Sequence, residues 1–430
     1  ATETTHTDGG VNTFRELGYA FEFGDPSSGN WVNTGLPKNT QIGGPLAAHV
    51  YDTPGTYTTS LVAWQPGGDY SVRTVEITVD DPDVVFSGNN TVCISRSNDF
   101  TGAPAGALQI PNASSWPSFE SGKRYLLHSG QDFTSLGAMY IPNIQTAQVG
   151  AFGSGAKPLT STVYMQATNP NYTGGWIEDV SVSGLNTGGV QNGITGINLL
   201  IYNNDTHTTD ARYEVATSFD WYRDNGHYAG LMVLPKNVFV IGNTNTNTGQ
   251  RGFGKGQTIW IDNHFDNAWQ HSIRLWQSYK TFMAHNLLES HSPGGGQSVL
   301  RLHAQGLDSV DIDAITTTEQ HQSRYIVIAD NILGAVDDAN TFNTLAYSPQ
   351  SNSYAEGCED LISERNQHIR GVYGGGWQTG HFGGRNIIQR GDTVSSGSMN
   401  TATGRDVASM PGGWNNDYFI GDTPIGSPPV

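Results

Sequence analysis

Two basic side chains share one short stretch of a sequence that contains only 21 lysines and arginines. Lys280 lies in "SYKTFMAHN", and Arg301 lies 21 residues later in "GGQSVLRLHAQG". If the two side chains lie side by side, their repulsion is relieved either by an anionic ligand or by loss of a proton, which lysine can lose and arginine cannot. A neutral lysine beside a fixed cation is a general base next to an anion-binding group.

This pair meets the requirements of β-elimination on a uronic acid in a polysaccharide. The reaction must stabilise charge on the uronate carboxylate, remove the proton at C5 and protonate the leaving oxygen at C4. We expect Lys280 to take the proton and Arg301 to neutralise the carboxylate or assist protonation, with His303 or Tyr279 as the proton donor. The side chains expected to bind the acidic polysaccharide substrate are Arg274, His271, His303, Arg324, Tyr279, Gln277 and Trp276.

The element that must position this pair is a repeat of short apolar runs that end in asparagine. The runs "NVFVIGN", "QTIWIDN", "KTFMAHN", "SRYIVIADN" and "DLISERN" end at Asn243, Asn263, Asn286, Asn331 and Asn366. The steps are 20, 23, 45 and 35 residues, and four coils of 20 to 23 residues can be counted if "LDSVDID" supplies a missing turn in the longest step. This period predicts a right-handed parallel β-helix, with a β-propeller or jelly roll as the alternative.

The repeat also predicts how the cations are arranged. Asparagine suits the turns because it tolerates the left-handed backbone conformation and can form a ladder with its neighbours. Lys280, Arg301 and Arg324 each lie six or seven residues before one of these turns or the inferred missing one. We therefore expect the three to stack about 4.8 Å apart, where each like-charged pair repels by about 4 kcal/mol at an effective dielectric of about 20.

The N-terminal part of the chain differs from this repeat. "TYTTSLVAW" and "YSVRTVEITV" have the alternation of strands, with "QPGGD" as the turn between them. "FEFGDPSSGNW" followed by "HVYDTPGTYTTSLVAW" resembles the PKD domain, an immunoglobulin-like β-sandwich, with Glu22 and Pro26 as departures from its pattern. The resemblance implies a module that serves as a spacer or holds substrate. The segment "DDPDVV" predicts a boundary at residue 82, with a β-helix catalytic domain over 83–430.

Composition limits the class of protein and its partners. Charged residues make up 14% and glycine accounts for 54 residues, which favours strands and turns and predicts an all-β protein. The formal net charge of −18 argues against nucleic acid or an anionic membrane as a partner. The start "ATETTHTDGG" reads as a processed or trimmed N-terminus, and we expect a secreted monomer. Cys93 and Cys358 either form one long-range bridge or are buried thiols.

The stretch around the two cations also carries a family resemblance. Over about 30 residues it resembles the β-helical polysaccharide lyases that include chondroitinase B and many alginate lyases, which implies that Lys280 and Arg301 occupy the catalytic positions. In that family, acidic residues five and seven positions before the lysine help to hold calcium. Here those positions are Leu275 and Ile273, so we expect no calcium site of that type, with Arg274 supplying the positive charge instead.

Besides the lyase, the sequence leaves two other functions open: a glycoside hydrolase and a non-catalytic solenoid. A glycoside hydrolase on the same scaffold would use paired carboxylates. The acidic groups that could supply them are Asp308, Asp311 and Asp313, expected to form a solvated turn, and Glu356, Glu359, Asp360 and Glu364, near the aromatic residues Tyr354 and Trp377. The histidines match no metal-binding spacing. The third possibility is a non-catalytic carbohydrate-binding or adhesive solenoid.

Overall fold

Strands dominate the described part of the chain in the computed structural model. The described residues are 4–6, 12–65, 68–142, 147–161, 163–166, 173–178, 181–182, 185–186, 197–207, 236–246, 252–268, 272–290, 300–303, 323–334, 345–347, 358–368, 384–394 and 418–420. The helices among them are short: α1 Thr13–Glu16, α2 Pro82–Val85, and the 3-10 turns Gly88–Asn90 and Thr134–Leu136. The prediction of an all-β protein is confirmed.

The N-terminal strands form one antiparallel sheet in the order β2-β1-β3-β4. Their bounds are β1 Gly18–Glu22, β2 Thr40–Gly43, β3 Gly55–Trp64 and β4 Tyr70–Val79. β3 and β4 pair along their whole length, from Gly55 opposite Val79 to Trp64 opposite Tyr70, so the predicted pair of strands and the turn between them are confirmed.

The rest of the chain builds parallel sheets, the largest of which has sixteen strands in the described residues. Thirteen follow one another side by side: β6 Leu108–Ile110, β5 Thr91–Ile94, β7 Arg124–His128, β9 Ala147–Phe152, β12 Thr173–Glu178, β15 Ile197–Tyr202, β17 Lys236–Ile241, β20 Thr258–Ile261, β22 Ile273–Ala284, β25 Ser323–Ala329, β28 Cys358–Glu364, β30 Gly384–Arg390 and β32 Tyr418–Ile420. Three more, β19 Gly252–Gly256, β24 Leu300–His303 and β27 Leu345–Tyr347, join through the first half of β22.

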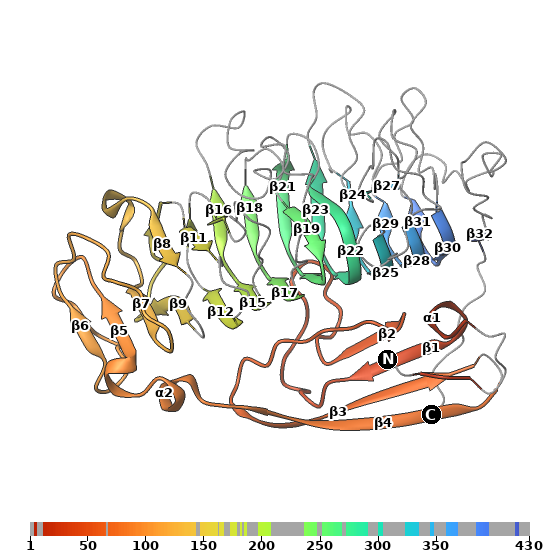
Figure 1. The fold of residues 1–430 in the computed structure, drawn as a ribbon, viewed down its shortest axis with the longest axis horizontal. Coiled ribbons are helices and arrows are strands. Elements are labelled where there is room, and N and C mark those ends of the chain that lie inside the picture. The colour runs from red at the N-terminus through yellow and green to blue at the C-terminus, as the bar shows by residue number, and fades with distance from the viewer. Residues whose placement is uncertain are drawn as a thin grey trace.

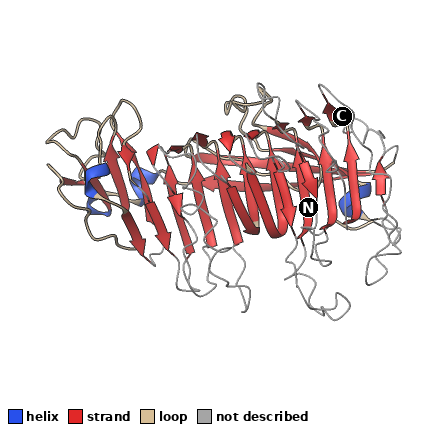
Figure 2. Cartoon of the chain, turned by 90° about the horizontal axis from the view of Figure 1, so that it is seen from above, coloured by secondary structure: helices blue, strands red, loops and turns tan. Residues whose placement is uncertain are grey.

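Two smaller parallel sheets accompany it. One has nine strands: β10 Leu159–Thr160, β13 Ser181–Val182, β16 Asp205–His207, β18 Thr244–Thr246, β21 His264–Ala268, β23 Leu287–Ser290, β26 Ile332–Leu333, β29 Gln367–His368 and β31 Thr393–Val394. The other has three: β8 Met139–Pro142, β11 Val163–Gln166 and β14 Leu185–Asn186. From β15 to β31 each strand of the nine-strand sheet directly follows a strand of the large sheet, and Figures 1 and 2 show the strands stacked side by side along the long axis. We call this assembly the stack.

A buried asparagine ladder lies at the turn between the two larger sheets, as predicted. The side-chain amide of each member donates to the amide oxygen of the next at 2.8 to 2.9 Å, through Asn243, Asn263, Asn286, Asn331 and Asn366. The ladder continues beyond the predicted members, because Asn204 donates to Asn243 and Asn366 donates to the carboxylate of Asp392. The residue before each turn at Asn263, Asn286, Asn331 and Asn366 has a positive φ of 53° to 59°.

The predicted count of equal coils is wrong. Asn286 donates directly to Asn331, and β22 pairs with β25, so the 45-residue step is one coil. The segment containing Asp308, Asp311 and Asp313 lies outside the described residues. Coil length varies because a longer connection between strands adds little loop-closure entropy and leaves the strand pairing intact.

The large sheet is buried on both faces over its central strands. Inward side chains such as Trp260, Met283 and Ile328 belong to the main core, whereas the alternate residues Ile261, Phe282 and Val327 pack in a second cluster with Trp31 of the N-terminal segment. Burial on both faces explains why these strands are continuous apolar runs. In Figure 1 the N-terminal sheet lies along one side of the stack, which is the face that it covers.

The junction between the two parts falls close to α2. β4 ends at Val79 and β5 begins at Thr91, so the predicted boundary at residue 82 lies between them, at the first residue of α2. Cys93 in β5 is a fully buried free thiol, and burial raises its pKa to about 11. Of the two alternatives for the cysteines, Cys93 is therefore not in a disulfide bridge.

Candidate functional site

Lys280 lies where β22 passes from its first half to the second. Its backbone has a positive φ of 52°, which is uncommon for a residue other than glycine. Tyr325 and Asp360 have the same conformation, with φ of 57° and 52°, and the register on either side places all three in one column across β22, β25 and β28. The left-handed conformation is therefore a feature of this corner of the stack, and it sets the direction of the Lys280 side chain.

Lys280 lines a pocket of about 240 Å³ at the seam between the N-terminal segment and the stack. The walls are mostly aromatic and apolar, and the lining residues are Thr13, Phe14, Tyr19, Pro45, Leu46, Tyr279, Lys280 and Tyr325. The amine of Lys280 is 5.2 Å from the ring centroid of Tyr279, and that ring makes an edge contact with Tyr325 at 5.7 Å. Among the described residues no carboxylate forms a salt bridge with Lys280, so its charge faces aromatic rings.

Two further rings of this pocket come from the N-terminal segment. Phe14 of α1 packs against Tyr325, with ring centroids 5.4 Å apart. The hydroxyl of Tyr19 donates to the backbone oxygen of Thr13, and burial raises the pKa of Tyr19 to about 12. The Tyr19 hydroxyl is thus protonated and already engaged, and the other two phenols that line the pocket belong to Tyr279 and Tyr325.

Arg324 lies near this pocket, but it is not part of a column of bare cations. Its Cα pairs with Tyr279, one residue out of step with Lys280. Its guanidinium lies 4.6 Å from the ring centroid of Tyr325 and forms an ion pair with the buried carboxylate of Asp360 at 3.2 Å. The predicted stacking of unpaired positive charges is therefore wrong at Arg324, because the next strand supplies a counter-ion.

Arg301 does not lie in register with Lys280. Its Cα pairs with Arg274 in the first half of β22, six residues before Lys280, and His303 pairs with Trp276. The predicted register failed because it relied on a turn near Asp308, whereas β24 pairs with a different part of β22. The two arginines that the structure does bring together on neighbouring strands are Arg274 and Arg301.

Other predicted site residues have no described side chain. His271 lies outside the described residues, and for Arg274, Trp276, Gln277, Arg301 and His303 only the backbone is described. Ile273 and Leu275 are fully buried in the main core. Within the described part of the chain, no three His, Cys, Asp or Glu side chains gather as metal ligands.

Tyr325, Phe14, Tyr19, Pro45 and Leu46 were not predicted. For Tyr325 the signal was present, because Lys280, Tyr325 and Asp360 each lie six residues before a ladder asparagine. Counting back from the ladder therefore identifies the column. No comparable signal marks the four residues that the N-terminal segment contributes.

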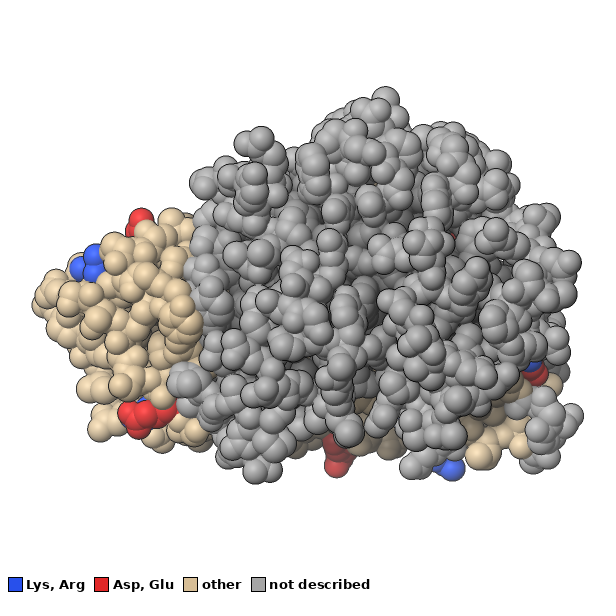
Figure 3. All heavy atoms as spheres, turned by 45° about the horizontal axis from the view of Figure 1, so that its top comes forward, with Lys and Arg blue, Asp and Glu red and all other residues tan. Residues whose placement is uncertain are grey.

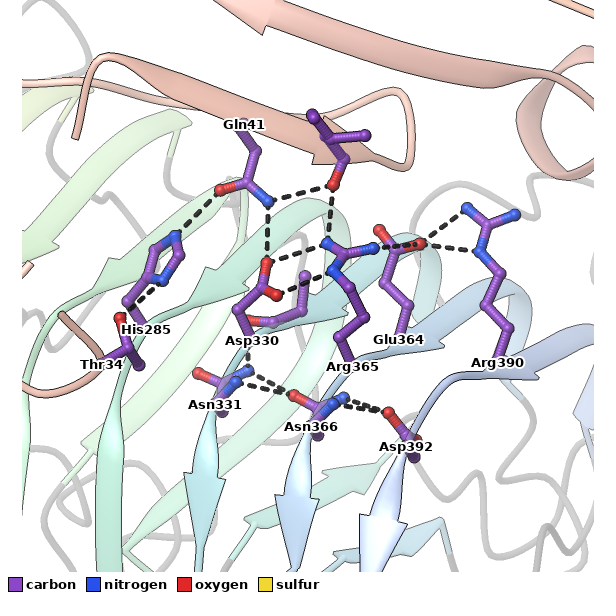
Figure 4. A network of polar contacts seen from close by, with 12 residues as sticks. Thr34, Gln41, His285, Asp330, Asn331, Glu364, Arg365, Asn366, Arg390 and Asp392 are labelled. Carbon is purple, nitrogen blue, oxygen red and sulfur yellow. Dashed lines mark hydrogen bonds and ion pairs between the residues drawn. The ribbon is translucent and has the colours of Figure 1, made fainter. Parts of the chain in front are cut away.

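A buried polar network fixes the N-terminal segment on the stack (Figure 4). Glu364, whose side chain is 1% exposed, accepts from Arg390 at 2.7 Å and from the backbone amide of Gly44 at 2.8 Å. Arg365 forms an ion pair with Asp330 at 2.8 Å and also donates to the backbone oxygen of Ile42. The carboxylates of the stack are thus matched to donors from both parts of the chain.

The same seam includes two groups with shifted pKa values. Asp262 accepts the backbone amides of Val32 and Asn33 at 2.9 Å, and burial raises its pKa although these two hydrogen bonds act in the opposite direction. His285 is 2% exposed, and burial lowers its pKa to about 4, assisted by Arg365 and opposed by Asp330.

The partners of His285 define its neutral form (Figure 4). Gln41 donates its side-chain amide to Asp330, so its oxygen faces His285 and accepts from Nε2 at 2.9 Å. Nδ1 is then left to accept from the hydroxyl of Thr34 at 3.1 Å. Protonating Nδ1 would remove that acceptor, next to the stacked ring of Trp31.

We expect the free energy of unfolding to fall between pH 6.5 and about 4 because of His285. The folded state binds fewer protons than the unfolded state in this window, so stability rises with pH there and is lost on acidification, by up to roughly 3 kcal/mol at and below pH 4. Asp262 acts in the opposite sense, because a raised carboxyl pKa favours the folded state in acid.

Comparing wild type with His285→Gln isolates the contribution of His285. Unfolding by urea at a series of pH values should give a smaller slope between pH 4 and 6.5 for the variant. His6→Gln, which alters only an exposed hydrogen bond between His6 and Gln65, is the control and should keep the slope of wild type. Equal slopes for wild type and His285→Gln would contradict the assignment.

Other charged groups lie elsewhere on the stack. His264 in β21 contacts Glu289 in β23 at 2.8 Å, which gives this histidine a structural partner.

On the face in Figure 3, the described charged side chains are scattered and form no continuous basic surface. None of the described helices is long and apolar enough to cross a membrane.

Comparisons with known proteins add no relative. No known family model matches this sequence, and comparison with curated proteins and with solved structures finds no similar chain.

Proposed function

We propose that this protein is a secreted, monomeric enzyme that cleaves an acidic polysaccharide by β-elimination at the Lys280 pocket. In this proposal the stack is a right-handed parallel β-helix and the N-terminal part is a PKD-like module. The parallel pairing from coil to coil and the buried asparagine ladder support the first assignment. The second assignment is supported by His49, whose ring lies 4.6 to 4.7 Å from the ring centroids of Phe23 and Tyr51 and whose Nε2 is 3.0 Å from the carboxylate of Asp25.

The observation that carries the proposal is a lysine in an aromatic pocket with no described carboxylate partner. A structural lysine would normally keep its amine in water or pair it with an acid. Here the amine lies beside Tyr279 in a pocket of about 240 Å³, and rings of this kind stack on the apolar faces of sugars. A cation among aromatic rings favours a ligand that is both anionic and ring-shaped.

The chemistry needs one base and one acid on the same sugar. The amine of Lys280, in its neutral form, takes the proton from C5 of the uronate, and the electron pair of that C–H bond forms the C4–C5 double bond. The C4–O bond breaks, and the leaving oxygen takes a proton from the hydroxyl of Tyr279. No oxidant or co-reactant is required, and the products are an unsaturated uronate and a chain with a new hydroxyl end.

The cations have separate roles in this arrangement. Arg324, opposite Tyr279, is the described cation that the register brings nearest to Lys280, and in this proposal the carboxylate of the reacting sugar competes with Asp360 for its guanidinium. Arg274 lies six residues before Lys280 and pairs with Arg301, so neither arginine is in register with Lys280, and this proposal gives them no role at the reacting sugar.

A screen of uronate polymers tests the function. Purified protein is mixed with alginate, polygalacturonate, glucuronan and chondroitin, and the ultraviolet absorbance of the unsaturated uronate is followed. We expect it to rise with at least one polymer. New reducing ends without that absorbance would instead identify a hydrolase, and binding without any cleavage would identify a carbohydrate-binding solenoid.

A further inference from the structure

A buried histidine near one end of the stack lies apart from the Lys280 pocket. His128 is the last residue of β7 and is 9% exposed, and its ring makes an edge contact with Phe152 of β9, with ring centroids 4.9 Å apart. Five strands of the large sheet separate β7 from β22 (Figure 1). Any role of His128 is therefore independent of the cleavage proposed at Lys280.

The two ring nitrogens of His128 have different surroundings. Nδ1 is 2.7 Å from the backbone oxygen of Ser129, which can only accept, so Nδ1 carries the proton of that hydrogen bond. Nε2 of the neutral ring then presents a lone pair. This atom is buried, and no described residue forms a hydrogen bond with it. Because buried polar atoms nearly always have a partner, Nε2 points to a ligand.

A carboxylate faces this nitrogen. Oδ2 of Asp99 is 3.5 Å from Nε2 of His128, which is longer than a good hydrogen bond. Oδ1 accepts from the backbone amide of Thr101 at 2.9 Å, which orients the group. Hydrogen bonds from Thr101 hold the pKa of Asp99 below its usual range, against the effect of burial and with help from His128. An ionised oxygen and a nitrogen lone pair therefore face each other.

The separation of these two atoms fits a shared metal ion. Nε2 of His264 is 2.8 Å from Glu289 and Nε2 of His49 is 3.0 Å from Asp25, which are hydrogen-bond distances. Two ligands of one zinc ion, with bonds of about 2.0–2.2 Å at a tetrahedral angle, lie about 3.4 Å apart, close to the separation at His128. A metal-binding histidine also usually donates its other ring N–H to a backbone oxygen or a carboxylate.

A glycine keeps the space beside Nε2 open. A methyl group at Gly153 would lie 3.6 Å from Nε2 of His128 and 2.9 Å from the backbone oxygen of Thr101. Both atoms therefore border the same small space, which makes the Thr101 oxygen the candidate third ligand. One imidazole, one carboxylate and one carbonyl form a mixed nitrogen and oxygen set, which suits Zn²⁺ with a water in the fourth position.

We infer that His128, Asp99 and the backbone oxygen of Thr101 form a binding site for one Zn²⁺ ion. Asp99 and Thr101 belong to the connection between β5 and β6, and Phe100 of this connection stacks on Phe152 with ring centroids 6.2 Å apart. The ion joins the connection to the end of β7. Its role is structural, because it fixes the segment that covers the first coils of the stack.

Titration of the full chain with zinc chloride, followed by calorimetry, tests the site. Histidines elsewhere in the chain also bind zinc, so the comparison is between wild type and variants. We expect His128→Gln to lose one zinc equivalent and Asp99→Asn to bind that equivalent at least about tenfold more weakly. Asp99→Asn keeps an oxygen for the amide of Thr101 and supplies an amide that can donate to Nε2, so it should fold. His264→Gln, at the histidine paired with Glu289, is the matched control and should keep the equivalent.

Hydrogen exchange shows where the ion binds. In wild type, zinc should slow exchange severalfold for the backbone amides of residues 95–107, and Asp99→Asn should lose this protection at the same zinc concentration. Exchange in β4, which is far along the chain from the site, should not change. Equal zinc binding by wild type, His128→Gln and Asp99→Asn, or zinc binding that leaves exchange over 95–107 unchanged, would overturn the site. Neither result bears on the proposed lyase.

Discussion

Replacing Lys280 by alanine should reduce β-elimination by about 10²- to 10⁴-fold, the usual contribution of a general base. The side chain faces a pocket and has no described ion-pair partner, so its removal leaves no buried charge behind. We therefore expect the thermal unfolding midpoint to stay close to that of wild type. The measurement is the initial rate of unsaturated uronate formation on the polymer that the screen identifies.

Lys280→Arg separates the role of charge from that of proton transfer. Arginine keeps the positive charge but cannot give up its proton, so this variant should bind polymer and remain as inactive as Lys280→Ala. Lys157→Ala, at a lysine of the stack that pairs with Asp205, is the matched control and should keep full activity. Wild-type rates in Lys280→Ala would remove the proposed base.

The asparagine turns could be predicted from the sequence because their chemistry repeats. Each needs a residue that accepts from the coil before it and donates to the coil after it, and a side-chain amide meets both requirements. That is why Asn263, Asn286 and Asn331 mark the coils while the lengths between them vary. Asp392 was not predicted because it is not an asparagine. A carboxylate can only accept hydrogen bonds, which suits the last member of the ladder.

The pairing of Arg301 could not be predicted from spacing. Strand register depends on which segments bond to one another, and an insertion of any length between two turns shifts the apparent count without moving the strands. Lys280 lies six residues before its ladder asparagine, Asn286, with no insertion between the two. Counting back from the ladder therefore places Lys280 in the correct column. Arg301 has no ladder residue close behind it, so its neighbour Arg274 appeared only in the structure.

The docking of the N-terminal segment also left no pattern in the sequence. Its contacts join residues more than 200 positions apart, such as Gln41 with His285 and Gly44 with Glu364. Single buried polar residues of this kind look like surface residues until their partners are known. The apolar runs predicted the strands, but nothing in them predicted that a second segment would cover their outer face.

Replacing Asn331 by alanine should lower the free energy of unfolding by about 3–5 kcal/mol, as the sum of several orphaned buried groups. The Asn331 amide donates to the backbone oxygens of Met283 and Ala329 and to Asn366, while its oxygen accepts from Asn286. All of these groups are sealed from water, since Asn331 is 0% exposed. Alanine leaves them unpaired and also opens a small cavity.

Two matched variants show whether the loss comes from the ladder. Asp392→Asn keeps an acceptor for Asn366 at the last rung and should change stability by less than about 1 kcal/mol. Gln367→Ala removes an exposed amide beside the ladder and should have a similarly small effect. Urea unfolding of the three variants gives the comparison. If Asn331→Ala is no less stable than Gln367→Ala, the ladder does not hold the coils together, and the corner that positions Lys280 must depend on packing alone.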